Sequence, residues 1–297
     1  MKLCFTESVR FDPAHLETLV VIADEGTFEA AARRLHLTPS AVSQRIRALE
    51  GSAGQVLVRR TSPASVTDAG APLLRLGRQL RLLADEAEEA LGDDGVTRLP
   101  VAVNADSLAT WFLPVLAAAA ARPRTALHLQ VEDESYSHDL LRSGEVMAAV
   151  TSEPRPVQGC SVETLGSLRY TPAARPTLLE LHRRGRGVDR AALPMVIFNE
   201  RDHLQDRALP DGVRPDVVHR VPSTQGHIAA VLAGLGWGMI PDPVFDRAQA
   251  DGTLAPLPGA EPILVTLHWQ RWRLASAALE ALTDDVCRAA ADALSPA

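Results

Sequence analysis

The sequence predicts an α/β protein in three parts: a small helical domain, a long connecting helix and a larger two-lobed α/β domain. Three observations support this fold class. Amphipathic helices follow one another closely over residues 15–50, leucines recur at helical spacing over 73–90, and β-strands alternate with helices after residue 98. A chain of 297 residues is also long enough for more than one hydrophobic core.

The first two predicted helices are short and closely spaced. Residues 15–25 place four apolar side chains on one helical face: Leu16, Leu19, Val20 and Ala23. Gly26 is a suitable C-terminal stop, and Thr27 is a good N-cap for a second helix over 28–35. A short connection then leads to a third helix. This spacing is typical of a helix-turn-helix.

The third predicted helix begins after Thr38, and its two faces differ in chemistry. Val42, Ile46 and Leu49 share one face. The opposite face carries hydroxyl, amide and guanidinium groups and no carboxylate: Ser40, Ser43, Gln44 and Arg47. Such groups can bond DNA base edges and phosphates without bringing a repelling charge. An ordinary amphipathic surface helix is the alternative, and this helix alone does not decide between the two.

The charge of the chain is unevenly distributed. Its net charge is −7, yet the window from Arg33 to Arg60 contains six arginines and one acid, Glu50. A basic window at a helix-turn-helix favours a nucleic-acid partner, with a solvated basic surface as the alternative.

A small β-hairpin is predicted over residues 55–70, QVLVRRTSPASVTDAG. Arg59 and Arg60 end its first strand, where arginines can enter a minor groove or hold phosphates. The predicted contacts to double-stranded DNA are Thr38, Ser40, Ser43, Gln44, Arg47, Arg59, Arg60 and Thr67.

The next segment carries a heptad-like repeat. Its members are spaced alternately by three and four residues: Leu73, Leu76, Leu80, Leu83, Ala87 and Ala90. That spacing forms an a/d seam, so we expect a linker helix over 69–92 that pairs with a second copy of the chain. Packing of the seam on the chain's own C-terminal domain is the alternative.

At this point the sequence resembles a known family. FEAAARRLHLTPSAVSQRIRALE, followed by GQVLVRR and TDAG, is similar to the winged helix-turn-helix of LysR-type transcriptional regulators, over residues 13 to about 91. The resemblance implies a homodimer or homotetramer that reads a dyad-related operator, with RNA polymerase as a further partner left open. It also implies three parts: the DNA-binding domain 11–68, the linker helix 69–92 and an effector-binding domain 93–297.

The remaining chain alternates strands and helices, as an α/β domain requires. Strands are predicted at 98–104, 125–133, 146–153, 194–200, 216–223, 237–242 and 262–270, and helices at 105–120, 137–145, 225–236 and 276–294. Two lobes with a cleft suit a small-molecule receptor. The layout resembles the periplasmic-binding-protein-like effector domain of the same family, with lobe I at about 98–170 and 267–297 and lobe II at about 171–266.

Four stretches resemble one branch of that family, the ArgP/LysG regulators of basic amino-acid transport. They are VNADSLATWFLP, LLRSGEVMAAVTSEPRPVQGC, QGHIAAVLAGLGWGMIP and WQRWRL. This resemblance implies that the effector is lysine, arginine or histidine, and that the protein controls a nearby basic amino-acid exporter gene. Two features depart from the family pattern: about ten residues precede Phe11, and Pro172 and Pro176 lie around a strand of lobe II.

The residue chemistry of the predicted cleft is compatible with such a ligand. Helix N-termini can hold its carboxylate, and acids can hold its cationic end. The candidate effector contacts are Asn104, Asp106, Ser107, Glu132, Asp133, Thr151, Asn199, Ser223 and Thr224, with Glu134, Glu200 and Asp202 as further acids. For each acid a solvated position is the alternative, and Asp106 can also cap its helix. The glycines of GLGWG, residues 234–238, lack the GxGxxG spacing and indicate a turn that packs Trp237 or admits a ligand.

Several classes of protein are disfavoured. Cys4, Cys160 and Cys287 form no CxxC pair, the histidines form no HxxxH or HExxH motif, and no nucleophile is spaced with a base, so we expect no metal, cofactor or enzyme activity. No signal peptide or apolar span is evident, so we expect a cytoplasmic protein without a membrane partner. The leading hypothesis is a ligand-responsive transcription regulator. The alternative is an architectural or replication-initiation-type DNA-binding protein with little ligand control.

Overall fold

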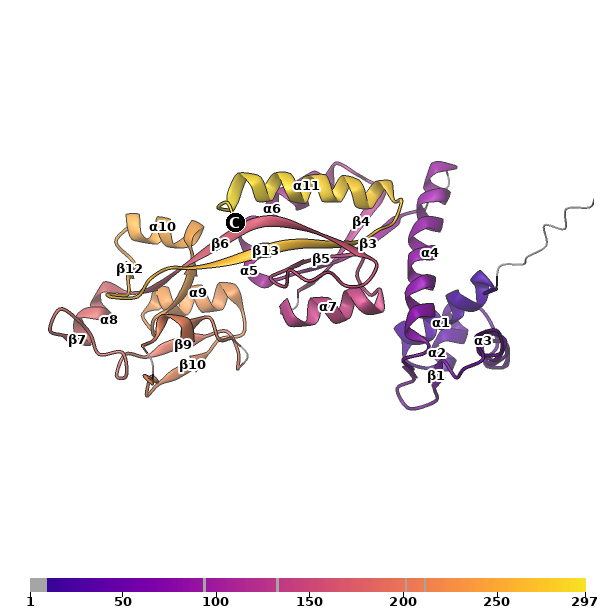
Figure 1. Cartoon of the computed structure of the whole chain (residues 1–297), viewed down its shortest axis with the longest axis horizontal. Coiled ribbons are helices and arrows are strands. Elements are labelled where there is room, and N and C mark those ends of the chain that lie inside the picture. The colour runs from indigo at the N-terminus through magenta and orange to yellow at the C-terminus, as the bar shows by residue number, and fades with distance from the viewer. Residues whose placement is uncertain (1–9, 93–94, 132–133, 201, 211) are drawn as a thin grey trace, which may run out of the picture.

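The computed structural model describes residues 10–92, 95–131, 134–200, 202–210 and 212–297. A small N-terminal domain lies at one end, and the elongated α/β domain extends to the other (Figure 1). Helix α4 (Ala71–Ala90) stands between them, with its axis across the long axis of the molecule.

The N-terminal domain contains α1 (Pro13–Glu25), α2 (Phe28–Arg34) and α3 (Pro39–Ala53). The predicted boundaries are confirmed by their caps. Gly26 ends α1 in the left-handed region, and the hydroxyls of Thr27 and Thr38 accept hydrogen bonds at the starts of α2 and α3. The apolar face of α3 is buried in the domain core, as predicted, so its polar face is turned outward.

The wing consists of β1 (Val58–Arg59) and β2 (Ser65–Val66), paired antiparallel. Glu50 holds it to α3: its Oε1 accepts from the backbone N–H of Leu57 at 3.0 Å and of Val58 at 3.5 Å. The single acid of the basic window is therefore committed to backbone groups of the wing.

Successive residues of an α-helix are rotated by about 100° around its axis. Helix α4 therefore turns different residues towards the N-terminal domain, the α/β domain and the remaining surface. Leu73, Leu74 and Gly77 pack against the N-terminal domain. Leu82 belongs to the core of the α/β domain. Leu76 is half-buried and packs against the core of the N-terminal domain. Four members of the predicted seam belong to neither core and are half-buried or exposed: Leu80, Leu83, Ala87 and Ala90. Leu73 was expected on the seam as well, but it is buried in its own domain because it lies one turn before the helix leaves α1.

Among the described residues, seven strands of the α/β domain form one sheet, in the order β11-β6-β13-β5-β3-β4 with β12 also paired to β6. The strands are β3 (Thr97–Val103), β4 (Thr125–Val131), β5 (Ala148–Thr151), β6 (Cys160–Ala174), β11 (Gly238–Pro241), β12 (Ala255–Pro256) and β13 (Ile263–Trp272). Three of them, β3, β4 and β5, are parallel, as predicted for lobe I.

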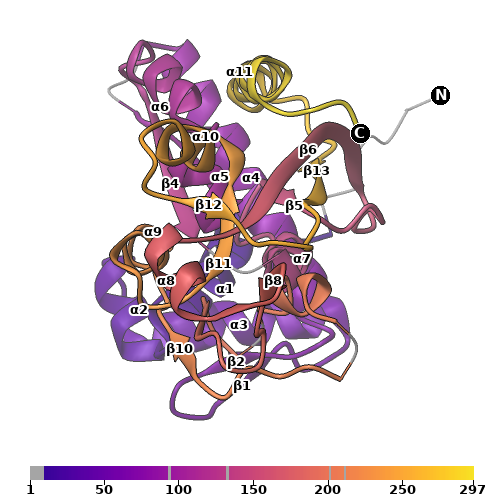
Figure 2. The ribbon, with the colours of Figure 1, turned by 90° about the vertical axis from the view of Figure 1, so that its left-hand side faces the viewer.

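The two lobes are joined by β6 and β13, which lie side by side (Figure 2) and run from one lobe into the other (Figure 1). The predicted lobe boundaries, near 170 and 267, fall inside these strands. Such long antiparallel strands give the lobes a continuous sheet rather than a flexible linker.

The lobe I helices are α5 (Ala105–Ala109), α6 (Leu113–Ala120), α7 (Glu134–Ser143) and α11 (Ala277–Ala293). Helices α6 and α11 cover one face of the sheet, and α7 covers the other (Figure 1). The single helix expected over 105–120 is wrong. The backbone leaves the helical conformation at Thr110, and a new helix begins at Leu113. Pro114 occupies the first turn of this helix, where a backbone N–H has no partner within the helix, so no hydrogen bond is lost.

Lobe II is built from α8 (Pro176–Leu181), β7 (Arg183–Arg184), β8 (Gly187–Val188), β9 (Met195–Ile197), the 3₁₀ turn η1 (Gln205–Ala208), β10 (Val218–Arg220), α9 (Thr224–Ala233) and α10 (Asp242–Ala250). Trp237, in the turn from α9 to β11, is fully buried. Packing of Trp237 thus explains this turn, one of the two readings that the sequence left open.

Candidate functional site

The outward face of α3 carries the side chains predicted to contact DNA. Ser40, Gln44 and Arg47 are exposed, and Ser43 is half-buried. Thr38 caps the helix through the Ala41 N–H at 3.2 Å, and its hydroxyl lies 2.9 Å from that of Ser40. These two hydroxyls therefore already have protein partners at the N-terminus of α3.

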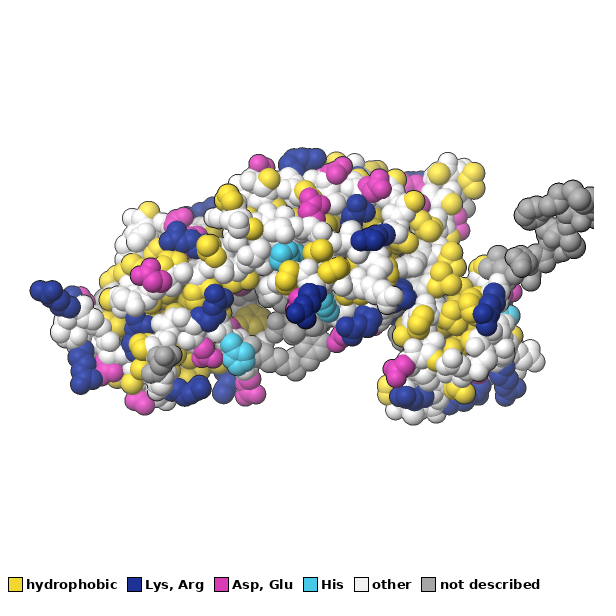
Figure 3. Space-filling model, viewed as in Figure 1, with side chains coloured by type: hydrophobic (Ala, Val, Ile, Leu, Met, Phe, Trp, Pro, Cys, Tyr) yellow, Lys and Arg dark blue, Asp and Glu magenta, His cyan; other side chains and the backbone are white. Residues whose placement is uncertain are grey.

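The wing adds two exposed arginines beside α3. Arg60 lies over the Phe28 ring, 4.8 Å from its centroid, a cation–π contact that restricts the guanidinium. Thr67 is engaged internally, because its hydroxyl donates to the Val56 carbonyl at 2.8 Å and accepts from the Gly70 N–H at 3.1 Å. Arginine side chains gather along the lower face of this domain (Figure 3). Those exposed are Arg33, Arg34, Arg47, Arg59 and Arg60.

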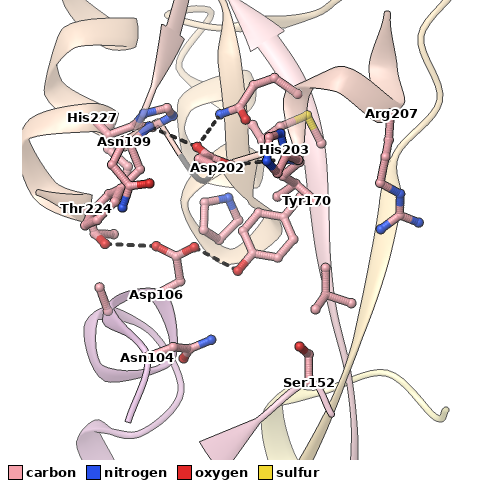
Figure 4. Close-up of a pocket in the computed structure, with 18 of the residues that line it drawn as sticks. Asn104, Asp106, Ser152, Tyr170, Asn199, Asp202, His203, Arg207, Thr224 and His227 are labelled. Carbon is pink, nitrogen blue, oxygen red and sulfur yellow. Dashed lines mark hydrogen bonds between the residues drawn. The ribbon is translucent and has the colours of Figure 1, made fainter. Parts of the chain in front are cut away.

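A cavity of about 780 Å³ lies between the lobes. Lobe I contributes residues that follow its parallel strands, among them Asn104 after β3 and Ser152 after β5. Lobe II contributes the segment after β9 and the start of α9 (Figure 4). Of the predicted effector contacts, the structure brings together Asn104, Asp106, Asn199 and Thr224.

Asp106 joins the two walls of this cavity. One carboxylate oxygen accepts from the Tyr170 hydroxyl at 2.8 Å, and the other accepts from the Thr224 hydroxyl at 2.9 Å (Figure 4). Tyr170 belongs to β6 and Thr224 begins α9, so a lobe I acid is held against lobe II. A helix-capping role, the alternative considered above, belongs to Asn104, whose side chain accepts from the Ser107 N–H.

The lobe II wall carries a second acid, Asp202. Its oxygens accept from the backbone N–H of Phe198 at 2.9 Å and of Leu204 at 3.2 Å, and from Gln205 Nε2 at 3.0 Å. These bonds shape the segment after β9 into a loop that faces the cavity. Glu200, another candidate acid, points to solvent and pairs with Arg220 at 3.6 Å.

His227 of α9 lines the same wall and is almost fully buried. Burial lowers the pKa of its ring, and the charges of Asp202 and Asp106 oppose this effect only in part. The neutral ring is therefore the favoured form near neutral pH.

Three of the predicted effector contacts do not line the cavity, and two more lie outside the described residues. Ser107 is buried inside lobe I, and Ser223 caps α9 by accepting from the Gly226 N–H. Thr151 is fully buried, and its neighbour Ser152 faces the cavity instead, because successive side chains of an extended strand point in opposite directions. Glu132 and Asp133 lie outside the described residues.

Several cavity residues were missed by the sequence analysis, among them Ser152, Tyr170, Gln205, Arg207 and His227. Three of them lie in segments whose role depends on long-range packing: β6 for Tyr170, and η1 for Gln205 and Arg207. A usable signal existed for His227, since it follows the candidate contact Ser223 by one helical turn and so shares that end of α9.

The described part of the chain also bears on metal binding, thiol reactivity and membrane insertion. It holds no group of three or more His, Cys, Asp or Glu residues that is arranged for a metal ion. Burial raises the pKa of the Cys160 thiol to about 12 and that of the Cys287 thiol to about 11, so both stay protonated at neutral pH. No described helix is both long and apolar enough to cross a membrane.

Family comparisons agree with this arrangement. Residues 13–71 match the bacterial regulatory helix-turn-helix of the lysR family, and residues 92–290 match the LysR substrate-binding domain. The chain belongs to the LysR family. Its members are transcriptional regulators with an N-terminal DNA-binding domain, so the LysR fold accounts for both ends of the molecule.

Similar proteins place this LysR-family chain near one group of regulators. It is 46% identical over 286 residues to the lysine export transcriptional regulatory protein LysG of Corynebacterium efficiens, covering 94% of this chain and 98% of that protein. The full-length LysG of Corynebacterium glutamicum with bound effector Arg superposes with a TM-score of 0.84 at 41% identity, covering 96% and 100% of the two chains. ArgP from Mycobacterium tuberculosis gives a TM-score of 0.87 at 40% identity, covering 97% and 99%.

Proposed function

We propose that this LysR-family regulator binds a basic amino acid between its lobes and controls a gene for basic amino-acid export. Arginine, lysine and histidine are the candidate effectors. The observation that carries this proposal is the pair of carboxylates, Asp106 and Asp202, on facing walls of the cavity. The names of the similar proteins, a lysine export regulator and a regulator with bound arginine, support the same ligand class.

The two acids suit the two cationic groups of a basic amino acid. Asp106 supplies a carboxylate at the lobe I side, and Asp202 supplies another at the lobe II side. Arg207 also lines the cavity and can attract the ligand's carboxylate. A ligand that touches both lobes binds their closed arrangement more tightly than an open one, and this differential affinity is what a regulatory switch requires.

Calorimetric titration of the full chain tests the effector claim. Arginine or lysine should bind, and neutral glutamine should bind far more weakly. Asp106→Asn should weaken binding of the basic amino acid by at least about tenfold, because a hydrogen bond to a charged group is worth roughly 1.5–3 kcal/mol. Glu200→Gln is the matched control, since this acid lies outside the cavity and should leave the affinity unchanged. Failure of arginine, lysine and histidine to bind at millimolar concentration would remove the proposal.

The DNA-binding part of the proposal is a homodimer or homotetramer that reads a dyad operator in the cytoplasm. The side of α4 that carries Leu80, Leu83, Ala87 and Ala90 belongs to neither core and supports pairing with a second copy. Leu80→Glu should shift the protein towards monomer in analytical ultracentrifugation and weaken operator binding. Leu181→Glu, which changes a more exposed leucine on α8, should do neither.

An effector domain with an interlobe cavity favours a ligand-responsive regulator over an architectural protein. Footprinting on the intergenic region beside the protein's own gene separates the two functions. One compact dyad site that changes when basic amino acid is added supports the regulator. Dispersed coverage of AT-rich DNA without ligand dependence supports the architectural role.

A further inference from the structure

A proline-rich segment follows β5 at the edge of the cavity. Its sequence is SEPRPVQ, residues 152–158, and its first residue, Ser152, lines the cavity (Figure 4). Pro154 and Pro156 have no backbone N–H, so the segment cannot form a complete ladder with a neighbouring strand. Residues 153–156 are exposed and make no backbone–backbone hydrogen bond with another described residue. The conformation of the segment therefore depends on side chains.

The side chain of Gln270, in β13, takes the place of a neighbouring strand. Its Oε1 accepts from the Val157 N–H at 3.1 Å, and its Nε2 donates to the carbonyls of Glu153 at 2.9 Å and Arg155 at 3.0 Å. These two carbonyls belong to the residues that precede the prolines. His138 of α7 is a further neighbour, with its Nε2 at 3.1 Å from the same amide nitrogen. One amide thus satisfies donor and acceptor groups of the segment, as a peptide group of a paired strand would.

The Gln270 amide is itself held firmly. It is completely buried, with an exposed fraction of 0%. Carbonyl oxygens face its Nε2 and an N–H faces its Oε1, so a flipped amide would place oxygen against oxygen. Its neighbours in the stretch WQRWRL anchor the strand to helices: Trp269 Nε1 donates to the Thr283 hydroxyl of α11 at 3.1 Å. Trp272 Nε1 donates to the Leu141 carbonyl, in α7, at 3.1 Å.

We propose that Gln270 is a positioning residue, which orders the segment 153–157 and so keeps Ser152 in place on the cavity wall before a ligand binds. This inference rests on the proposed function. Gln270 does not line the cavity, so it acts on a ligand only through the segment. An ordered segment spares the ligand the entropic cost of ordering it. Loss of the amide should therefore weaken arginine and lysine by similar factors.

Hydrogen–deuterium exchange on the unmodified full-length protein tests the ordering of the segment. Without any amino acid, the Val157 amide should exchange at least about a hundredfold more slowly than an unstructured amide, because it is bonded to a buried acceptor. This measurement does not depend on the folding of a variant. An unprotected Val157 amide that becomes protected only when arginine is added would mean that the ligand orders the segment, and it would overturn the proposal.

Gln270→Met removes the amide and keeps the length of the side chain. The freed backbone groups of residues 153–156 can reach water, so the segment should loosen while the fold is retained. The Val157 amide should exchange at least about tenfold faster, and in calorimetric titration arginine and lysine should both lose about tenfold in affinity. Gln249→Met, the same substitution at an exposed glutamine of α10, is the matched control and should change neither quantity.

The outcomes for Gln270→Met separate positioning from other roles. Unchanged exchange would mean that the segment is held without the amide, and faster exchange with unchanged affinity would mean that the cavity does not use its order. A loss confined to one of the two ligands would mean direct recognition. Each of these three results overturns the proposal. If the wild type binds no basic amino acid, the proposed function fails, and exchange alone still decides whether Gln270 orders the segment.

Discussion

Arg60 and Gln44 are both exposed in the DNA-binding domain but are held differently. Arg60 of the wing stacks on Phe28, whereas Gln44, exposed in the middle of the polar face of α3, makes no side-chain hydrogen bond with another described residue. A stacked arginine is positioned to hold a phosphate, whereas an exposed amide can read a base edge. We therefore expect Arg60 to contribute to the affinity for any DNA, and Gln44 to the specificity for the operator sequence.

Alanine substitutions should distinguish these two roles. Arg60→Ala should weaken binding to all DNA sequences and reduce the slope of log K against log salt by about one. Gln44→Ala should cost roughly 1–3 kcal/mol on the operator and little on random DNA. Fluorescence anisotropy at several salt concentrations measures both effects. A sequence-independent loss for Gln44→Ala would exclude base reading by this residue.

His227 also predicts a pH dependence of stability. Because its folded pKa lies below the ordinary value of 6.5, the unfolded chain binds more protons in the window between the two values. Stability should therefore fall as pH decreases through that window, by at most about 1.4 kcal/mol per pH unit from this residue. Chemical denaturation of wild type and His227→Phe between pH 5 and 8 isolates the contribution, which should be absent from the variant. Parallel pH profiles would contradict it.

At the scale of elements, α4 packs against α1 on one side and against lobe I on another. Its contact with α1 is very close, since a Cβ on Gly77 would lie 2.7 Å from Val20 Cγ2 and 3.1 Å from the Leu16 carbonyl oxygen. The opposite side contacts lobe I, where Glu86 accepts from the Ala278 N–H and Glu89 accepts from the Thr97 hydroxyl. The alternative of packing on the chain's own effector domain therefore holds for one face of the helix, while the seam stays available to a partner.

A pair of glycine substitutions tests the α1–α4 contact. Gly77→Ala should destabilise the protein by about 1–3 kcal/mol, because overpacking outweighs the gain in helix propensity. Gly51→Ala is the matched control on exposed α3, where no atom lies within 4 Å of the new Cβ, and it should stabilise by about 0.5–1 kcal/mol. Urea denaturation measures both. Stabilisation by both alanines would show that α1 and α4 can separate without cost.

Local patterns predicted the elements whose partners are close in sequence. Val42, Ile46 and Leu49 are buried as expected because a single helical period and two neighbouring helices decide their positions. The pairing of β6 with β13 was not predictable, since the strands lie about a hundred residues apart and their register depends on the whole domain. The cavity residues divide in the same way, into those that a local pattern indicated and those that depend on long-range packing. Asp106 was found beside a cap signal, whereas Gln205 and His227 meet only through lobe II packing.

At the scale of the whole molecule, the parallel strands of lobe I connect the cavity to α4. Asn104 and Ser152 follow the carboxyl ends of β3 and β5 and line the cavity. Beside the other ends of these strands, the Ser143 carbonyl accepts from Arg78 Nη1 at 3.2 Å, and Glu145 lies 3.7 Å from the same atom. Arg78 also pairs with Asp24 of α1 at 2.8 Å. One arginine of α4 thus contacts both the DNA-binding domain and lobe I.

Arg78→Gln should uncouple ligand binding from DNA binding. The cavity is unchanged in this variant, so the affinity for arginine should stay within about twofold, whereas the ligand-dependent change of the operator footprint should be lost or much reduced. Arg183→Gln, which breaks an exposed ion pair with Glu180 in lobe II, is the control and should retain the footprint change. A full response in Arg78→Gln would mean that another contact transmits the signal.

Helix α4 has one face on α1, one on lobe I and one on the seam. These three faces restrict which insertions and deletions the helix can accept. Inserting one residue after Gly77 would turn everything beyond it by about 100° around the helix axis, so lobe I and the seam would both lose their registration with the DNA-binding domain. An insertion close to a whole number of turns, such as one of about seven residues, would restore all three directions. We therefore expect length variation among orthologues to avoid this helix and to accumulate in exposed turns, such as the one between β7 and β8.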